Sequence, residues 1–203
     1  MDSFSDRSKR NVLSSLFRLN HIAKLTSLFL VAQLLPVCFT DRNAEKKQIL
    51  LELIADFQVD LQKNLESAIK TKGIVGAIEI CRTVSPAKEA DVKTSFPGIS
   101  FRRISDKPRN PNHVPDVWEA EIFEQWKKTA KNGGAPYLVM NSNDKEVRVL
   151  QPIVLQNPTC LKCHGGPRDI DPAVSKKISE LYPQDKAVGY KLGELRGAFS
   201  AIW

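Results

Sequence analysis

This chain lacks the features that mark several large classes of protein. It has no dense run of Lys or Arg interleaved with aromatic residues, although its formal net charge is +7 over 203 residues. The basic side chains are scattered through segments of mixed sign such as residues 106–109, which argues against a nucleic-acid partner. The chain also has no internal repeat and no low-complexity tract. Its 42% of hydrophobic residues is ordinary for a globular protein and excludes a wholly disordered one.

No hydrophobic run is long enough for an ordinary membrane-spanning helix. The run over residues 25–38 is shorter than the roughly 20 residues that a span needs, and Gln33 and Pro36 interrupt it. Basic residues precede this run, an order typical of a secretory signal, but a clear cleavage site is missing. Cys38 at its end is a candidate for lipid attachment.

The length suits one domain with a sizeable core plus a leader. We expect residues 1–40 to be a signal peptide, a lipoprotein leader or a retained N-terminal anchor, and residues 41–203 to be the domain. The protein is therefore expected in the periplasm or elsewhere outside the cytoplasmic membrane, either soluble or attached to the membrane through its N-terminus.

The first part of the domain has the periodicity of a long helix. Between residues 46 and 72, apolar side chains recur at steps of three or four: Leu50, Ile54, Phe57, Leu61, Leu65 and Ile69. Gly73 is expected to end this helix. Residues 74–80 fit a short strand or the end of a turn, and a short helix is expected to open at Pro86.

The rest of the domain mixes strand and helix patterns. Strands are expected at residues 99–104, 137–141, 147–155 and 197–203, and helices from Asp116 to the glycines at 133–134 and over residues 172–182. Pro152 predicts an edge position or a bulge in its strand. This order predicts an α+β fold, with an antiparallel sheet and helices packed on one side of it, preceded by the long N-terminal helix.

The strongest chemical signal is Cys160-x-x-Cys163-His164. Two thiols at this spacing can add to the two vinyl groups of haem, and the adjacent His can then bind the iron as its axial base. A redox dithiol does not need the His, and a structural zinc site needs four ligands, of which Cys81 would supply only one more. The pattern therefore predicts one covalently attached haem c.

A second axial ligand is less well defined by the residues alone. Cys81, His113 and Met140 are candidates within the domain, whereas Met1 and His21 lie in the leader. Met140 lies in an apolar strand typical of core packing, and His113 lies in a loop rich in proline. Cys81 is the unpaired Cys of the domain, and it can be either a buried structural residue or a thiolate ligand.

Several separated motifs, in order, resemble the Tll-type single-haem cytochrome c family, long described as a domain of unknown function. The likeness runs from about Lys47 to Trp203 and rests on Ala77-Ile-Glu-Ile-Cys81, Arg102-Arg103-Ile-Ser105 with Arg109-Asn110-Pro111, Pro115-x-x-Trp118-Glu119, Gln151-Pro152-Ile153, Cys160-Leu-Lys-Cys-His-Gly165, and Leu181-Tyr182-Pro183 with Asp185, Ala187, Gly189-Tyr190, Gly193 and Arg196-Gly197. The resemblance implies a PAS-like fold around one haem c, with iron held by the residues that match His164 and Cys81. Larger relatives add a signalling output module, which does not follow Trp203 in this sequence.

The resemblance leaves the role of three arginines in these motifs open. Arg102, Arg103 and Arg109 can pair with the haem propionates, or they can hold a structural loop together.

Two protein ligands to iron leave no open position for a substrate, which favours electron transfer or redox sensing with a partner protein over catalysis. A gas sensor, in which Cys81 leaves the iron on reduction, is the main alternative, and a peroxidase or reductase is the weaker one.

Overall fold

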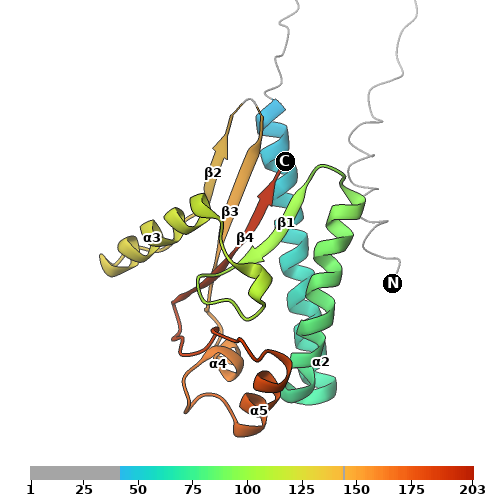
Figure 1. The fold of residues 1–203 in the computed structure, drawn as a ribbon, viewed down its shortest axis with the longest axis vertical. Coiled ribbons are helices and arrows are strands. Elements are labelled where there is room, and N and C mark those ends of the chain that lie inside the picture. The colour runs from blue at the N-terminus through green and yellow to red at the C-terminus, as the bar shows by residue number, and fades with distance from the viewer. Residues whose placement is uncertain (1–41, 144) are drawn as a thin grey trace, which may run out of the picture. The chain divides into compact units, whose positions relative to one another are not determined.

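The computed structural model describes residues 42–143 and 145–203 (Figure 1). Its elements are α2 (Arg42–Ser95), β1 (Ser100–Ile104), η1 (Pro111–His113), α3 (Val117–Lys131), β2 (Val139–Ser142), β3 (Val147–Val154), α4 (Pro158–His164), α5 (Pro172–Leu181) and β4 (Leu195–Ile202). The expected leader, with Cys38, Met1 and His21, lies outside the described residues. None of the described helices has the length and hydrophobicity needed to cross a bilayer.

Helix α2 is two helical legs joined at Gly73. This residue has φ 70° and ψ 176°, a conformation that is accessible to glycine and strained for other residues. Figure 1 shows the two legs, coloured cyan and green, running side by side in opposite directions. An ion pair of 2.5 Å between Lys88 and Asp60 joins the legs. The helix break predicted at Gly73 is therefore present.

The segment after Gly73 differs from its prediction. Residues 74–80 are helical rather than a strand, and Pro86 lies inside the second leg rather than at the start of a helix. Ile78 of this leg packs against Val174 and Ile178 of α5. Burial of one helical face against α5 outweighs the preference of Ile and Val for strands, which is worth only a fraction of a kcal/mol per residue.

The four strands form one antiparallel sheet in the order β1-β4-β3-β2, so the last strand of the chain lies between the first and third. One face packs on α2 through a core that includes Phe57, Phe101 and Phe199. The opposite face packs on α3, where Phe123 and Trp126 are buried. The predicted α+β class, antiparallel sheet and long N-terminal helix are confirmed, but the helices cover both faces and not one, because consecutive residues of β4 are buried on both sides.

Pro152 lies in β3 beyond the four residues that pair with β2. Proline has no N–H to donate to a neighbouring strand, so a position on the unpaired side suits it. The pairing of β3 with β4 shifts register one residue later, between Ile153 and Val154. At Pro152 the strand is thus unpaired on one side, and an irregularity in pairing follows one residue later, as the proline predicted. The chain leaves the sheet there and enters α4.

Candidate functional site

Helix α4 carries the whole Cys160-x-x-Cys163-His164 motif. The side chain of Asn157 caps it by accepting a hydrogen bond of 2.9 Å from the Thr159 N–H, and Pro158 occupies the first turn. Gly165 ends it, and a Cβ at this position would lie 2.6 Å from Asp169 Cβ and 2.7 Å from the Leu161 oxygen. Only glycine fits this position without movement, so local sequence shapes the motif.

The two thiols of α4 lie against different apolar clusters. Cys160 packs against Leu155, Ala187 and Tyr190. Cys163 packs against the cluster shared by the second leg of α2 and α5. Both are half-buried free thiols, and burial raises the pKa of Cys163 although Arg109 opposes the shift.

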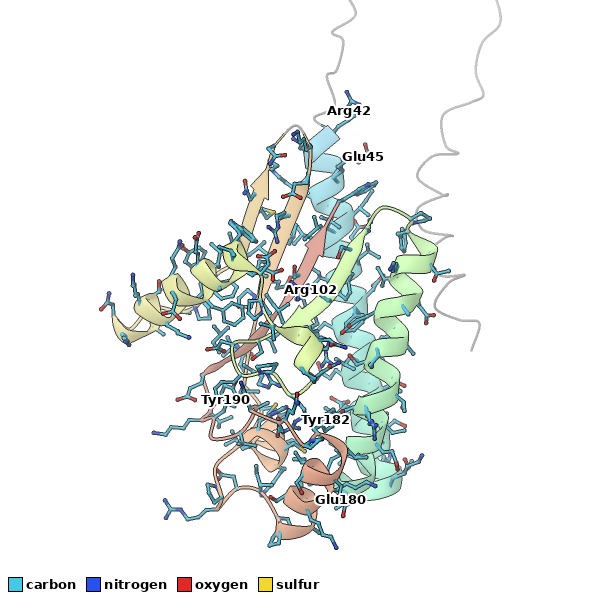
Figure 2. All side chains as sticks on the ribbon, in the orientation of Figure 1. Arg42, Glu45, Arg102, Glu180, Tyr182 and Tyr190 are labelled. Carbon is cyan, nitrogen blue, oxygen red and sulfur yellow. The ribbon has the colours of Figure 1, made fainter. Side chains whose placement is uncertain are left out.

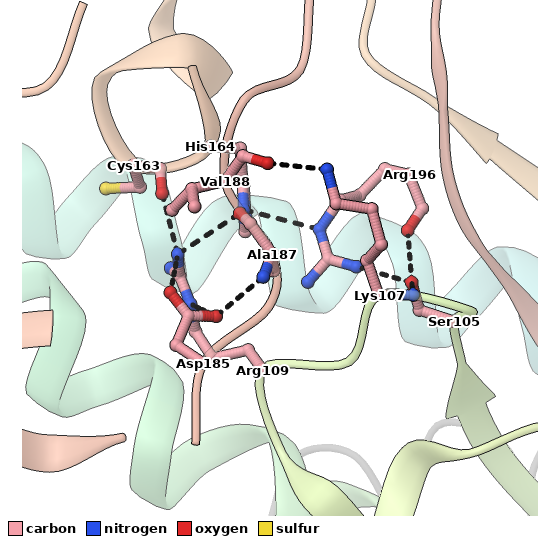
Figure 3. Close-up of polar contacts among 9 residues, drawn as sticks. All are labelled: Ser105, Lys107, Arg109, Cys163, His164, Asp185, Ala187, Val188 and Arg196. Atoms are coloured by element: carbon pink, nitrogen blue, oxygen red, sulfur yellow. Dashed lines mark hydrogen bonds and ion pairs between the residues drawn. The ribbon is translucent and has the colours of Figure 1, made fainter. Parts of the chain in front are cut away.

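His164 is oriented by the segment that precedes β4. Its Nδ1 lies 2.8 Å from the Ala187 oxygen, as Figure 3 shows, and a carbonyl oxygen can only accept a hydrogen bond. Nδ1 must therefore carry the hydrogen, which leaves the lone pair on Nε2. The Tyr190 N–H donates to the His164 oxygen at 2.9 Å and holds the same two segments together.

Charge around the ring keeps His164 neutral. Burial lowers its pKa well below the usual value, and the cations of Arg196 and Arg109 add to this shift. The result is a neutral imidazole whose Nε2 is available to bind a metal, the arrangement seen when a ligating His donates its other nitrogen to a backbone carbonyl.

Arg109 ties α4 to the segment before β4 (Figure 3). Its Nε and Nη2 donate to the two carboxylate oxygens of Asp185 at 3.1 and 3.0 Å, and Nη2 also donates to the Cys163 oxygen at 2.7 Å. Asp185 in turn accepts a hydrogen bond of 2.9 Å from the Ala187 N–H. The Arg109–Asp185 pair therefore fixes the position of Ala187. The Ala187 oxygen in turn orients the ring of His164.

Cys81 lies on the second leg of α2, one turn after Ile78. Burial raises the pKa of its thiol, and the charges of Arg103 and Arg109 oppose the shift. Ile78, one turn before Cys81, packs in the same apolar cluster as Cys163 and Tyr182, so Cys81 lies on the helix turn next to the motif. The fold thus brings together Cys81 and the motif, which are far apart in the sequence.

Comparison with known proteins identifies the fold. A family model described as Tll0287-like matches residues 39–203. The chain belongs to the Tll0287-like family. The crystal structure of the cyanobacterial heme-protein Tll0287 is similar to it with a TM-score of 0.60 and 21% sequence identity, over 77% of this chain and 93% of that chain. No curated protein matches. The family resemblance read from the sequence is therefore confirmed.

Within this Tll0287-like domain, the three arginines predicted to contact a haem have different surroundings. Arg102 donates to Glu119 at 2.6 Å and to the Val114 oxygen at 2.8 Å, and Figure 2 shows it beside the sheet, away from Tyr182 and Tyr190. Arg109 is committed to Asp185 and Cys163. Arg103 Nε lies 3.6 Å from a carboxylate oxygen of Glu89 on the second leg of α2, and its charge acts on both Cys81 and His164.

The other two candidate ligands are placed differently. His113 Nε2 lies 3.2 Å from a carboxylate oxygen of Glu89. Met140 is 46% exposed on β2, an outer strand, and is not a core residue. Met140 pairs with Val149 in the first half of β3, whereas the motif on α4 follows the other end of that strand.

From the sequence, Arg196 and Tyr190 could border the edge of a haem, but their spacing alone does not show it. Its Nη1 donates to Ser105 Oγ at 3.0 Å, and its Nε lies 3.3 Å from His164 Nδ1. Burial lowers the pKa of Arg196 to about 10, a large shift for a guanidinium. Arg196 belongs to one of the family motifs in the sequence, but only the pairing of β4 beside β1 places its side chain at the Cys160-x-x-Cys163-His164 motif.

The site has the chemistry that a haem c needs. It offers two thiols, a neutral imidazole with Nε2 available, a third sulfur nearby, and half-buried cations suited to the two carboxylates of haem. Two buried atoms make no close hydrogen bond: Tyr190 Oη, which lies beside Ser105 and Arg196, and Arg103 Nε, which lies 3.6 Å from a carboxylate oxygen of Glu89. Among residues 42–143 and 145–203, no three His, Cys, Asp or Glu side chains are grouped closely enough to hold a bare metal ion.

Proposed function

We propose that this chain binds a single haem c and serves in electron transfer or redox sensing. Thioether bonds from Cys160 and Cys163 would hold the haem, with His164 and Cys81 as axial ligands of the iron. The observation that carries the proposal is the 2.8 Å contact of His164 Nδ1 with the Ala187 oxygen, because it leaves Nε2 for iron next to two thiols. The crystal structure of a related cyanobacterial heme-protein supports it.

A haem supplies one-electron chemistry, and the protein residues decide how it is held. Ala187 fixes the tautomer and the orientation of His164, and Arg109 with Asp185 fixes Ala187. Cys81 would supply the second protein ligand to the iron. A thiolate ligand donates electron density, so we expect a reduction potential well below that of proteins with His and Met ligands.

The test is maturation of the full chain in a bacterial host that attaches haem c. We expect a pigment that resists extraction by acidified acetone, and a low-spin thiolate signal in the electron paramagnetic resonance spectrum of the oxidised protein. A colourless protein, or pigment that acidified acetone removes, would refute covalent haem. A thiolate signal that survives Cys81→Ser would refute this ligand.

Matched variants separate attachment from ligation. Cys160→Ser with Cys163→Ser should lose the covalent pigment, whereas Cys81→Ser should keep it and change its spectrum. Addition of carbon monoxide to the reduced wild-type protein tests the gas-sensing alternative. A spectrum that carbon monoxide leaves unchanged favours electron transfer or redox sensing, and a new absorption band favours gas binding.

We also propose that the protein acts outside the cytoplasmic membrane. The basic segment and apolar run before the domain support export, as does the need for haem attachment there. Fractionation of cells that express the full chain should place the pigment in the periplasm or on the outer side of a membrane. Pigmented protein in the cytoplasm would contradict this proposal.

A further inference from the structure

We infer that Arg196, with the hydroxyl of Tyr190, forms the binding site for a haem propionate. The inference rests on the proposed function and assigns a role to two residues near His164. It differs from the sequence prediction, which gave this role to Arg102, Arg103 and Arg109.

Arg196 is a half-buried cation without a carboxylate partner. Within the described residues it forms no ion pair, whereas Arg102, Arg103 and Arg109 pair with Glu119, Glu89 and Asp185. Its one close side-chain acceptor is the neutral Ser105 Oγ. Burial of an unpaired charge is costly, so a site built around one is suited to an anion.

The guanidinium is held in place before any anion arrives. Ser105 Oγ accepts from Arg196 Nη1 at 3.0 Å and donates to the Arg196 backbone oxygen at 2.8 Å. The Lys107 N–H donates to Ser105 Oγ at 3.1 Å and holds that hydroxyl in turn. A donor fixed in this way loses little conformational entropy on binding a carboxylate.

The contact of Arg196 with His164 does not use up its donors. Nδ1 of His164 carries the hydrogen that it donates to the Ala187 oxygen, so it cannot also accept from Arg196 Nε at 3.3 Å. Two N–H groups face each other there. Arg196 Nε therefore has no acceptor at this contact, beside the ring that would bind the iron.

A second observation lies in Tyr190. Its hydroxyl is buried beside Ser105 and Arg196 and makes no hydrogen bond of good geometry to either, and its ring lies 5.6 Å from Arg196 Cζ and 6.4 Å from the ring of His164. Buried polar groups are nearly always hydrogen-bonded, so this hydroxyl is suited to donate to an added acceptor. A carboxylate accepts both from a guanidinium and from a phenol, and haem carries two carboxylates beside its iron.

The test compares the haem-loaded full chain with Arg196→Gln, Arg196→Lys and Tyr190→Phe. Loss of the cation should favour the oxidised haem, whose charge is more positive, by about tenfold in the reduction equilibrium, which is 59 mV for one electron. Arg196→Lys should keep most of the wild-type potential. Tyr190→Phe should shift it in the same direction by a smaller amount, because the propionate loses one donor.

Resonance Raman bands of the propionate groups report the contact directly, and they should move in Arg196→Gln and in Tyr190→Phe. Arg168→Gln removes the same charge from an exposed position and should change neither readout. Unchanged bands and potential in pigmented Arg196→Gln would overturn the inference. If that variant does not mature, unchanged bands in Tyr190→Phe and Arg196→Lys would overturn it. Absence of covalent haem from the wild-type protein would instead overturn the proposed function.

Discussion

Replacement of Arg109 by Met should destabilise the protein through the site and not through the core. The side chains of Arg109 and Asp185 are only 13% and 8% exposed, so solvent screens their ion pair little. Removal of one partner from a buried pair costs about 3–5 kcal/mol. Because Asp185 keeps its hydrogen bond from the Ala187 N–H, we expect the lower end of that range, about 3 kcal/mol. Urea denaturation of the haem-loaded protein measures this loss as a lower midpoint.

Two further variants show whether the loss of stability comes from the Arg109–Asp185 pair. Arg109→Lys keeps the charge but has a single donor group, so it should recover only part of the lost stability. The double variant Arg109→Met with Asp185→Asn should cost less than the sum of the single variants, by about 1–3 kcal/mol. A loss under about 1 kcal/mol in Arg109→Met, or additive losses in the double variant, would refute the reasoning.

Two other predictions concern the core and acid stability. Phe57→Ala should cost about 3–5 kcal/mol in urea denaturation, because Phe57 is fully buried, whereas Val59→Ala on the exposed side of the same leg should cost about 0.5 kcal/mol or less; equal losses would contradict the packing described above. Burial acts to raise the pKa of Glu89, but His113 and Arg103 outweigh it, so the pKa lies below the usual 4.5. A lowered pKa means that the charged Glu89 stabilises the fold at neutral pH and that this contribution is lost as the pH falls through the folded-state pKa. The stability advantage over Glu89→Gln should therefore be present at pH 7 and shrink as the pH falls below 4.5; an advantage that does not change over this range would count against it.

Much of the fold could be predicted because its signals are local. The capping box of α3, in which Asp116 accepts from the Glu119 N–H at 2.8 Å and Glu119 accepts from the Asp116 N–H at 2.7 Å, needs only residues three apart. The break at Gly73 needs only one residue that tolerates a positive φ. Residues 74–80 were predicted wrongly because their conformation depends on α5, about a hundred residues further along the chain.

The candidate site also has a part that the sequence predicts and a part that only the tertiary structure places. The spacing of Cys160, Cys163 and His164 is visible in the sequence, since it lies within one short helix. Arg102 and Arg103 are neighbours on one strand and face opposite ways, so Arg102 reaches Glu119 while Arg103 lies near Cys81. One face of β1 packs on α2 and the other on α3, and the sequence alone does not say which arginine lies on which face.

By itself, the sequence determined the motif on α4, the Gly73 break, most strands and the membership of a family. Only the tertiary structure decided that β4 pairs between β1 and β3, and thereby that Arg196 lies beside His164 without a carboxylate. The physical reason is the separation in sequence between the residues that interact. Helix periods, caps and turns act over a few residues, whereas strand order and the partners of buried charges depend on which distant segments share one core.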